Sequence, residues 1–375
     1  MARLLKRCSR LSLVVVPLEG RIEEPAVSKT EAEFGLEALM NFEPWPVRGF
    51  EARLRHEFDP WFLNTDGKRL SPQDSRRLKA LAESHDVVWF RGTAIPNGSG
   101  ISHWPRLVLD IDDIPSQYHW SEARSAHSLK KKALALRRCW FSKRRERTLL
   151  GRFGVLGVCS KADRQYMGDD DRIHIIPNGF NLPEVQTTRM LSQPPRIGFI
   201  GTLRHPPNRD GLEWFIRKVW PRLKAEVPAV RLRLIGAETD TGISASGADI
   251  DGLGWVEDPA TEIASWSLMV VPVQAGGGTR IKVAEGFARK CPVVSTPLGA
   301  FGYEVQTEAE ILFAETPNQF TQACTRLVRE PRLGSEIAER AFEKYRRCWT
   351  WDAIEPCVAG AIEKVMRDCP RRISG

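Results

Sequence analysis

The residues with the clearest chemical potential follow an apolar run, Val270–Val273. A glycine turn leads from that run into a predicted helix that begins at about Thr279, and it consists of Gly276, Gly277 and Gly278. Glycine lets the backbone approach a ligand closely, and the N–H groups at a helix start favour an anion. Arg280 and Lys282 add positive charge to the first turn, where the helix dipole favours acidic side chains. The pattern predicts a phosphate site, with a flexible surface loop as the alternative.

Glu285 lies one helical turn after Lys282, on the same predicted face. Its carboxylate is placed to accept hydrogen bonds from vicinal hydroxyls, such as those of a ribose. A surface ion pair between Lys282 and Glu285 is the alternative interpretation.

A second glycine turn begins at Gly201, after the first apolar run of the same half of the chain. Arg204 and Arg209 follow it closely enough to reach a diphosphate from the other side of a cleft. Asn208 or Asp210 is expected to cap the next helix. Capping is the favoured role for Asp210, because that role requires only position.

Three aspartates lie near the end of another apolar run, Leu107–Ile111, and these are Asp110, Asp112 and Asp113. Alternate side chains of a strand point to opposite faces, which argues against a metal ion shared by the aspartates. We assign Asp112 and Asp113 as the catalytic residues, in contact with an acceptor at the rim of a cleft. Capping of the next turn is the alternative. His103 and His119 are further candidate proton acceptors, although an ordinary loop histidine is the simpler interpretation of each.

The segment Lys130–Arg147 carries nine Lys or Arg residues and a single acid, Glu146, with Leu, Trp and Phe side chains between them. Contact with an anionic membrane surface is one interpretation, because each basic residue near such a surface contributes about 1 kcal/mol. The other interpretation is a solvated helix face that packs its Leu and Trp side chains inward. Nucleic acid is not expected as a partner, since no reading motif accompanies the charge.

The pattern of apolar residues predicts the elements that position these side chains. Runs typical of strands are Leu11–Pro17, Val87–Phe90, Leu107–Ile111, Val155–Cys159, Ile173–Ile176, Ile197–Ile200, Val230–Ile235, Leu268–Val273 and Pro292–Ser295. Amphipathic stretches lie between them, at Asp210–Glu226, Thr279–Lys290 and Thr321–Glu330. Strands that alternate with helices and are apolar on both faces indicate parallel α/β sheets, whose ligands bind beyond the carboxyl ends of the strands.

The length of 375 residues favours two domains, because a single core rarely grows beyond roughly 250–300 residues. Turn residues and prolines between Pro183 and Pro195 mark a boundary. We predict two doubly wound, Rossmann-like domains at residues 1–185 and 195–355, followed by a C-terminal helix and tail at residues 356–375. The first domain is expected either to open with the strand at Leu11–Pro17 or to begin one strand late.

Composition narrows the class of protein. Hydrophobic residues make up 42% and charged residues 27%, as in ordinary globular proteins, which excludes disordered and collagen-like classes. The net charge of +8 suits an anionic partner. The eight cysteines never form a Cys-x-x-Cys motif, so reduced thiols of a cytosolic protein are expected and zinc is not. No apolar run approaches the ~20 residues of a membrane span, and no signal-peptide cleavage site follows Met1–Arg10.

Two segments resemble the glycosyltransferase group 1 family, Gly276–Glu285 and Pro292–Ala300. Members of this family are retaining enzymes of the GT-B fold, which has two Rossmann-like domains facing across a cleft and uses a nucleotide-sugar donor. The resemblance covers about residues 155–355, where Gly201–Phe215 and Ile176–Phe180 fit the same pattern. It implies that the C-terminal domain binds the donor and the N-terminal domain the acceptor.

The resemblance also assigns individual residues. Glu285 corresponds to the second glutamate of the family's Glu-x7-Glu motif, the one that binds the donor ribose. Arg204 and Lys282 correspond to basic residues near the diphosphate, and Val256 to a residue beside the base. Gly277 replaces the first glutamate of the motif, which affects the donor sugar expected. The complete set of predicted donor contacts adds Gly201, Asn208, Gly276, Gly277, Gly278, Thr279 and Arg280.

The implied reaction transfers a sugar from a UDP- or GDP-sugar to a glycan, lipid-linked or small-molecule acceptor, as in polysaccharide biosynthesis. It must stabilise an oxocarbenium-like centre and a departing nucleoside diphosphate. No metal or cofactor is expected, since Arg204, Arg280, Lys282 and the helix dipole would neutralise the leaving group. The expected location is the cytoplasm, with peripheral contact at the inner face of the membrane. A nucleotide-sugar epimerase and a non-catalytic sugar-nucleotide-binding protein are the alternative functions.

Overall fold

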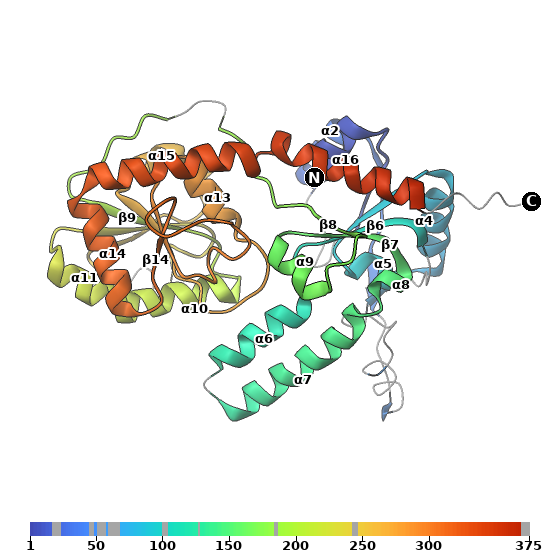
Figure 1. Cartoon of the computed structure of the whole chain (residues 1–375), viewed down its shortest axis with the longest axis horizontal. Coiled ribbons are helices and arrows are strands. Elements are labelled where there is room, and N and C mark those ends of the chain that lie inside the picture. Colours follow the sequence, from blue (N-terminus) through green and yellow to red (C-terminus); the bar gives the residue numbers. More distant parts are fainter. Residues whose placement is uncertain are drawn as a thin grey trace, which may run out of the picture. The chain divides into compact units, whose positions relative to one another are not determined.

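The structure is a computed structural model that describes residues 1–16, 24–44, 49–50, 58, 68–99, 104–126, 128–183, 187–241 and 247–368. The chain divides into two compact units, each with its own parallel sheet (Figure 1). The first unit contains residues 1–120, 133–177 and 354–375, and the second contains residues 121–132 and 178–353. The C-terminal segment from residue 354 onward is therefore part of the first unit.

The main sheet of the first unit has four parallel strands. In spatial order they are β5 (Val88–Arg91), β6 (Trp104–Ile111), β7 (Phe153–Val158) and β8 (Ile173–Ile175). Leu107, Val108 and Leu109 are fully buried although they alternate along β6, so this strand is covered on both faces. Burial on both faces is typical of a parallel sheet between helices.

Two short strand pairs accompany this sheet. β1 (Leu13–Val15) pairs in parallel with β2 (Leu36–Leu39), and β3 (Phe42–Pro44) pairs antiparallel with β4 (Lys68–Leu70). The helices that accompany these strands along the chain are α1 (Ala2–Cys8), α2 (Glu24–Phe34), α4 (Pro72–Ser84), α5 (Ala94–Gly98), α6 (Pro115–Ser125), α7 (Leu129–Glu146), α8 (Leu149–Arg152), α9 (Lys161–Met167) and α16 (Trp351–Asp368). None of the helices in the described part of the chain combines the length and apolar character that crossing a bilayer requires.

The sheet of the second unit has six parallel strands. Their spatial order is β11 (Ile250–Gly252), β10 (Arg231–Ile235), β9 (Arg196–Ile200), β12 (Leu268–Val271), β13 (Val293–Ser295) and β14 (Leu312–Phe313). The chain therefore proceeds outward from β9 in one direction and from β12 in the other. In sheets of this kind, ligands bind beyond the carboxyl ends of the strands at the point where the order reverses, which here lies between β9 and β12.

Helices cover both faces of this sheet. An apolar cluster that includes Phe199, Phe215 and Phe320 lies under α10 (Pro206–Trp214), the π-helix η1 (Phe215–Val219), α11 (Trp220–Glu226) and α14 (Pro317–Arg329). A second cluster, with Trp266, Phe287 and Tyr345, lies under α12 (Ala260–Ala264), α13 (Ile281–Ala288) and α15 (Pro331–Cys348). Both helix layers fix the ends of β9 and β12, where the candidate ligand contacts are found.

All nine predicted strand runs coincide with strands of the structure, with small shifts at their ends. Helix α10 differs, because it begins at Pro206 with His205 as its N-cap. Proline suits the first positions of a helix, since its missing N–H would have no partner there. Asn208 and Asp210 therefore lie inside α10, and the prediction that either residue caps it is wrong. Helix α13 begins at Ile281 with Arg280 as its N-cap, slightly later than the predicted start at Thr279.

Candidate functional site

The turn after β9 requires a glycine because two side chains close over it. Gly201 N donates to the Ile235 carbonyl (2.8 Å), which holds the turn against the end of β10. Gly201 has a φ of 155°, and an added Cβ would stand 2.8 Å from Lys282 Nζ and 2.9 Å from Asn208 Nδ2. Sequence reasoning did not select Gly236, whose added Cβ would overlap the Gly201 carbonyl. Both positions need glycine so that the backbone and these side chains can approach each other.

Lys282 is the central cation of the site. Its Nζ donates to Asn208 Oδ1 (2.7 Å) and lies 4.5 Å from the centre of the Phe199 ring. Burial first, and then the charge of Arg280, lower the pKa of Lys282 to about 7, while Glu285 opposes this shift. The surroundings of Lys282 within the chain therefore disfavour its ammonium form. An anion beside Nζ would favour the charged form and raise the pKa of Lys282.

Asn208 orients this lysine from α10. Its Nδ2 donates to the Thr202 carbonyl (3.0 Å), which turns Oδ1 toward Lys282. The Asn208 side chain is buried, so its hydrogen bonds form in surroundings of low dielectric constant, where they are stronger than in water. Three residues predicted separately as donor contacts, Gly201, Asn208 and Lys282, are thus in mutual contact at the reversal point of the sheet.

The glycine turn after β12 is organised by Arg280. The buried guanidinium donates to the Gly277 carbonyl and, at 2.8 Å, to the Gly278 carbonyl. Gly276 has a φ of 129°, and a Cβ at this position would stand 2.5 Å from Arg280 Nη2. Arg280 therefore has a structural task that the sequence did not reveal, because it holds two carbonyls of the turn.

Two further hydrogen bonds fix the ends of this turn. Asn178 Nδ2 donates to Thr279 Oγ1 (2.9 Å), and Tyr303 Oη donates to the Arg280 carbonyl (3.1 Å). Sequence reasoning quoted Asn178 only as part of a motif and did not select Tyr303. The only signal for Asn178 in the sequence was its place in the turn segment Ile176–Phe180.

His205 adds a third basic group and was also missed. Burial lowers the pKa of His205, and the charges of Arg280 and then Lys282 lower it further. The three side chains therefore share one electrostatic environment. A bound anion would favour their charged forms together. In the sequence, the available signal for His205 was its place directly before the two prolines that start α10.

Glu285 is half-buried on α13 and accepts a hydrogen bond from Arg289. Arg289 Nε lies 3.2 Å from Glu285 Oε1, one turn along the helix. Burial raises the pKa of Glu285, while Arg289 and Lys282 oppose the shift. Arg289 also lies 3.7 Å from Asp258, in the loop that carries Val256. Arg289, absent from the sequence prediction, thus links the predicted ribose contact to the loop of the predicted base contact.

Arg204, Arg209 and Val256 have other partners within the second unit. Arg204 is largely exposed, and its Nε donates to Glu238 (2.8 Å). Arg209 pairs with its neighbour Asp210 (3.2 Å). Each of these arginines would have to leave its carboxylate to reach a phosphate. The half-buried Val256 packs against the apolar cluster under α13.

In the first unit, Arg91 connects two of the three aspartates. Its Nη2 donates to Asp112 (2.9 Å), and its Nη1 lies 3.5 Å from Asp110. Burial raises the pKa of Asp110 to about 6, although Arg91 opposes the shift. Cys159 Sγ donates to the Asp112 carbonyl (3.3 Å). Arg91, Asp110, Asp112 and Cys159 thereby join the carboxyl ends of β5, β6 and β7.

The other candidates of this unit are placed as follows. Asp113 is exposed at the end of the β6 segment, beside the half-buried Asp112, and His119 is half-buried on α6. His103 lies outside the described residues. Within the ranges that the structure describes, no three His, Cys, Asp or Glu side chains are grouped to hold a metal ion.

Residues 194–330 match the family model of glycosyl transferases group 1, which confirms the resemblance seen in the sequence. This segment contains all the predicted donor contacts, from Gly201 to Glu285. No curated protein matches the chain in sequence.

Several solved structures share the fold. Sucrose-phosphate synthase from Thermosynechococcus elongatus has a TM-score of 0.62 at 12% identity, with 95% of this chain and 99% of that chain covered. Anabaena HepE in complex with UDP and glucose has a TM-score of 0.62 at 13% identity, with 96% and 94% covered. TarM has a TM-score of 0.58 at 14% identity, with 77% of this chain covered. The chain spans 57% of the length of that TarM structure and 61% of a second one, from S. aureus. These likenesses identify the fold as GT-B, with Rossmann-like α/β units.

Proposed function

We propose that this chain, whose residues 194–330 match the group 1 glycosyl transferases, transfers a sugar from a nucleoside-diphosphate sugar to an acceptor. The observation that carries this proposal is the contact among Gly201, Asn208 and Lys282 at the point where the strand order reverses. A lysine whose pKa is lowered to about 7 beside a neutral amide is a site prepared for an anion.

The diphosphate of the donor would lie against Lys282 and the N-terminus of α13. The helix dipole, Lys282 and a protonated His205 would oppose the negative charge that develops on the departing nucleoside diphosphate. Arg280 would act indirectly, by holding the conformation of the glycine turn through its hydrogen bonds to two carbonyls. These cations support transfer that needs no metal ion or other cofactor, and activity should then survive treatment with a chelator.

The nucleoside would extend from the diphosphate toward Glu285 and Val256. Glu285 would accept hydrogen bonds from the ribose hydroxyls, and Arg289 would keep its carboxylate in place. HepE was crystallised with UDP and UDP-glucose, which makes UDP the first nucleotide to test, with GDP as the comparison. Gly277 lacks the carboxylate that the family motif places at this position, and we infer that the sugar specificity differs accordingly.

The acceptor would be a glycan or a lipid-linked sugar bound by the first unit. Asp112, held by Arg91, and the exposed Asp113 are the candidate acceptor contacts, and Asp110 supports the position of Arg91. We propose transfer with retention at the anomeric carbon, in the cytoplasm, at the inner face of the membrane. Analysis of the product by NMR tests the stereochemistry directly.

The donor site is tested by binding and by turnover with the same protein. UDP at 100 times its dissociation constant should stabilise the protein by about 2.7 kcal/mol, which is readily seen in a melting curve. Glu285→Gln removes the charge and keeps the size, so UDP affinity should fall roughly ten- to hundredfold. Unchanged UDP affinity in Glu285→Gln would remove the ribose assignment.

Turnover separates a transferase from a protein that only binds sugar nucleotides. A transferase releases UDP from the sugar donor when an acceptor is present, whereas a binding protein shifts the melting curve and releases none. An epimerase would convert the donor without releasing the nucleotide. Asp112→Asn should reduce UDP release without weakening UDP binding, because Asp112 belongs to the acceptor side.

A further inference from the structure

We propose that helix α7 docks this protein on an anionic lipid surface through one exposed face. This face consists of Leu129, Ala133, Leu136 and Trp140, which we call the α7 stripe. The sequence spacing between neighbours is 4, 3 and 4 residues, so the four side chains lie along one side of the helix.

The α7 stripe is open to solvent rather than packed. Leu129 is 88% exposed, Trp140 54% and Leu136 38%, and Ala133 is exposed as well. The side chains of α7 that are buried are Ala135, Arg145 and Glu146. The sequence alternative, a solvated face with Leu and Trp packed inward, is therefore wrong for this helix.

Basic side chains border the stripe on both sides. Lys132 lies along one border, and Arg137 and Arg144 lie along the other, and all three are exposed. Arg144 also lies near the Trp140 ring, with 5.9 Å between its guanidinium carbon and the ring centre. An apolar stripe bordered by cations is the pattern of a helix that lies in the membrane interface, where tryptophan is a preferred residue.

Two side chains near the C-terminal end of α7, Glu146 and Lys143, attach the helix to the first unit. Glu146 accepts hydrogen bonds from Ser116 N (2.8 Å) and from the Ser116 hydroxyl. Lys143 Nζ donates to the Tyr166 carbonyl (2.9 Å) and lies over the Tyr166 ring. The single acid of the segment is thus used for attachment. The outward face of the helix carries only apolar and basic side chains.

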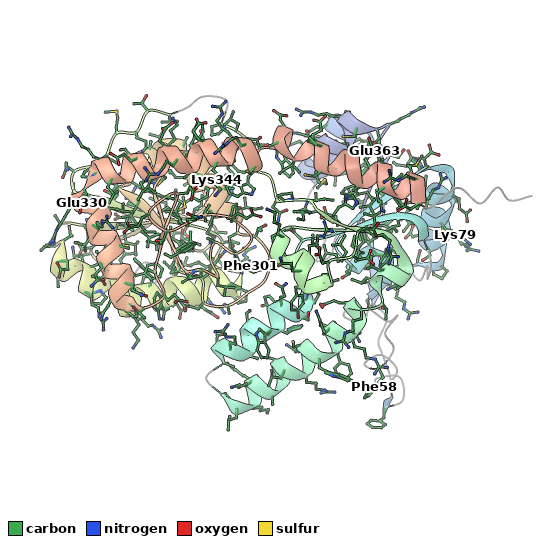
Figure 2. All side chains as sticks on the ribbon, in the orientation of Figure 1. Phe58, Lys79, Phe301, Glu330, Lys344 and Glu363 are labelled. Atoms are coloured by element: carbon green, nitrogen blue, oxygen red, sulfur yellow. The ribbon has the colours of Figure 1, made fainter. Side chains whose placement is uncertain are left out.

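Another aromatic residue of α7 is covered, which distinguishes it from the stripe. Phe141 makes edge contacts with the rings of Trp140 and Phe58, at 4.9 Å and 5.4 Å between ring centres (Figure 2, where Phe58 is labelled). Phe141 thus has ring partners within the chain, whereas Leu129, Leu136 and most of Trp140 are open to solvent, as is Leu134 (44%) elsewhere on the helix.

The side chains of the α7 stripe and its basic borders favour lipid over the other possible partners. A second copy of α7 would bring like charges together, because the helix carries basic residues throughout and one acid. Single-stranded nucleic acid stacks successive bases on exposed aromatic rings, whereas the α7 stripe offers one ring, that of Trp140, beside three aliphatic side chains. Aliphatic side chains beside Lys and Arg suit acyl chains beneath anionic headgroups.

Vesicle co-sedimentation tests this inference on the full chain. The protein should sediment with phosphatidylcholine vesicles that contain phosphatidylserine, and binding should weaken as salt increases. Replacing Leu129, Leu136 and Trp140 by Ser should weaken binding at least tenfold. Replacing Lys132, Arg137 and Arg144 by Gln should also weaken it at least tenfold and remove most of its dependence on salt.

Matched variants control for the loss of exposed apolar or basic side chains in general. Leu182, Met190 and Met366 are exposed elsewhere, and their triple replacement by Ser should leave lipid binding unchanged. Replacing the exposed Arg76, Lys79 and Arg367 by Gln should do the same. UDP binding, measured on every variant, reports whether the second unit is intact and tests the proposed function separately.

Three outcomes would overturn the lipid assignment. These are equal recovery with neutral and anionic vesicles, a monomer–dimer equilibrium lost in the stripe variant, and tight binding to single-stranded RNA without binding to vesicles. Loss of UDP binding with normal vesicle binding would instead count against the transferase and leave the lipid surface in place.

Discussion

Arg280 and Lys282 have different roles in the site, although both were predicted from one pattern of charge. Arg280 donates to two carbonyls of its own turn, whereas Lys282 is held by an amide oxygen and an aromatic ring. The sequence predicted that cations gather here, because residue type and spacing are visible in it. It did not reveal which cation is hydrogen-bonded to the turn itself. That depends on backbone carbonyls whose direction is set by the positive φ of Gly276 and Gly278.

The two residues should therefore respond differently to truncation. Arg280→Ala leaves buried carbonyls without donors, so the free energy of unfolding of the ligand-free protein should fall by about 1–3 kcal/mol. Lys282→Met should leave this stability equal or higher, yet weaken UDP binding at least tenfold. Melting curves with and without UDP measure both effects. A stable Arg280→Ala protein with normal UDP binding would contradict the structural task given to this arginine.

The pKa of Lys282 predicts how affinity and stability depend on pH. With a folded pKa of about 7 against an ordinary 10.5, the unfolded chain binds the extra proton between these values. Stability of the free protein should therefore rise with pH in this window. UDP favours the charged form, so its affinity should fall above pH 7 and binding should take up protons. Calorimetry in buffers of different ionisation enthalpy measures that uptake.

Lys282→Arg provides the control, because arginine remains charged throughout this range. In that variant the affinity for UDP should vary less with pH and proton uptake should shrink. An identical pH profile in Lys282→Arg and the unmodified protein would assign the titration to another group, with His205 next to be tested.

At the scale of elements, the sequence predicted the strands of both main sheets except β11 and β14, the two edge strands of the second unit. Strands such as β6 and β12 are apolar on both faces, which gives a continuous signal in the sequence. β11 and β14 have three and two residues, and Ile250–Gly252 includes an aspartate and a glycine, so their pattern is too short to identify. The start of α10 was missed because its first turn consists of prolines and polar residues.

At the same scale, one residue, Glu146, holds helix α7 against the first unit. Glu146 accepts two hydrogen bonds from Ser116 at the start of α6, and burial raises the pKa of Glu146. Glu146→Ala should lower the free energy of unfolding by about 1–3 kcal/mol and speed amide hydrogen exchange at both helix ends. The exposed Arg144→Ala is the control on the same helix. Unchanged exchange in Glu146→Ala would show that the helix is held by other contacts.

At the scale of the molecule, the sequence predicted two Rossmann-like units but left the last helix apart from them. α16 contributes residues to both units, with residue 354 as the dividing point. Buried residues of α16 such as Ile354 and Val358 are spaced as in any amphipathic helix. Helical periodicity identifies the inward face of a helix, but it does not say which core that face will join, so the assignment depends on the folded structure.

The net charge of +8 is a whole-molecule property that should act on the donor before it binds. Raising ionic strength from about 0.01 to 0.15 M shortens the screening length from about 30 to 8 Å. The association rate of UDP should then fall severalfold, while that of uridine, which carries no phosphate, should stay constant. Stopped-flow measurements on both ligands separate attraction by the surface from contacts within the site. If salt slows UDP and uridine equally, the surface charge does not steer the donor, and electrostatic selection begins only at Lys282.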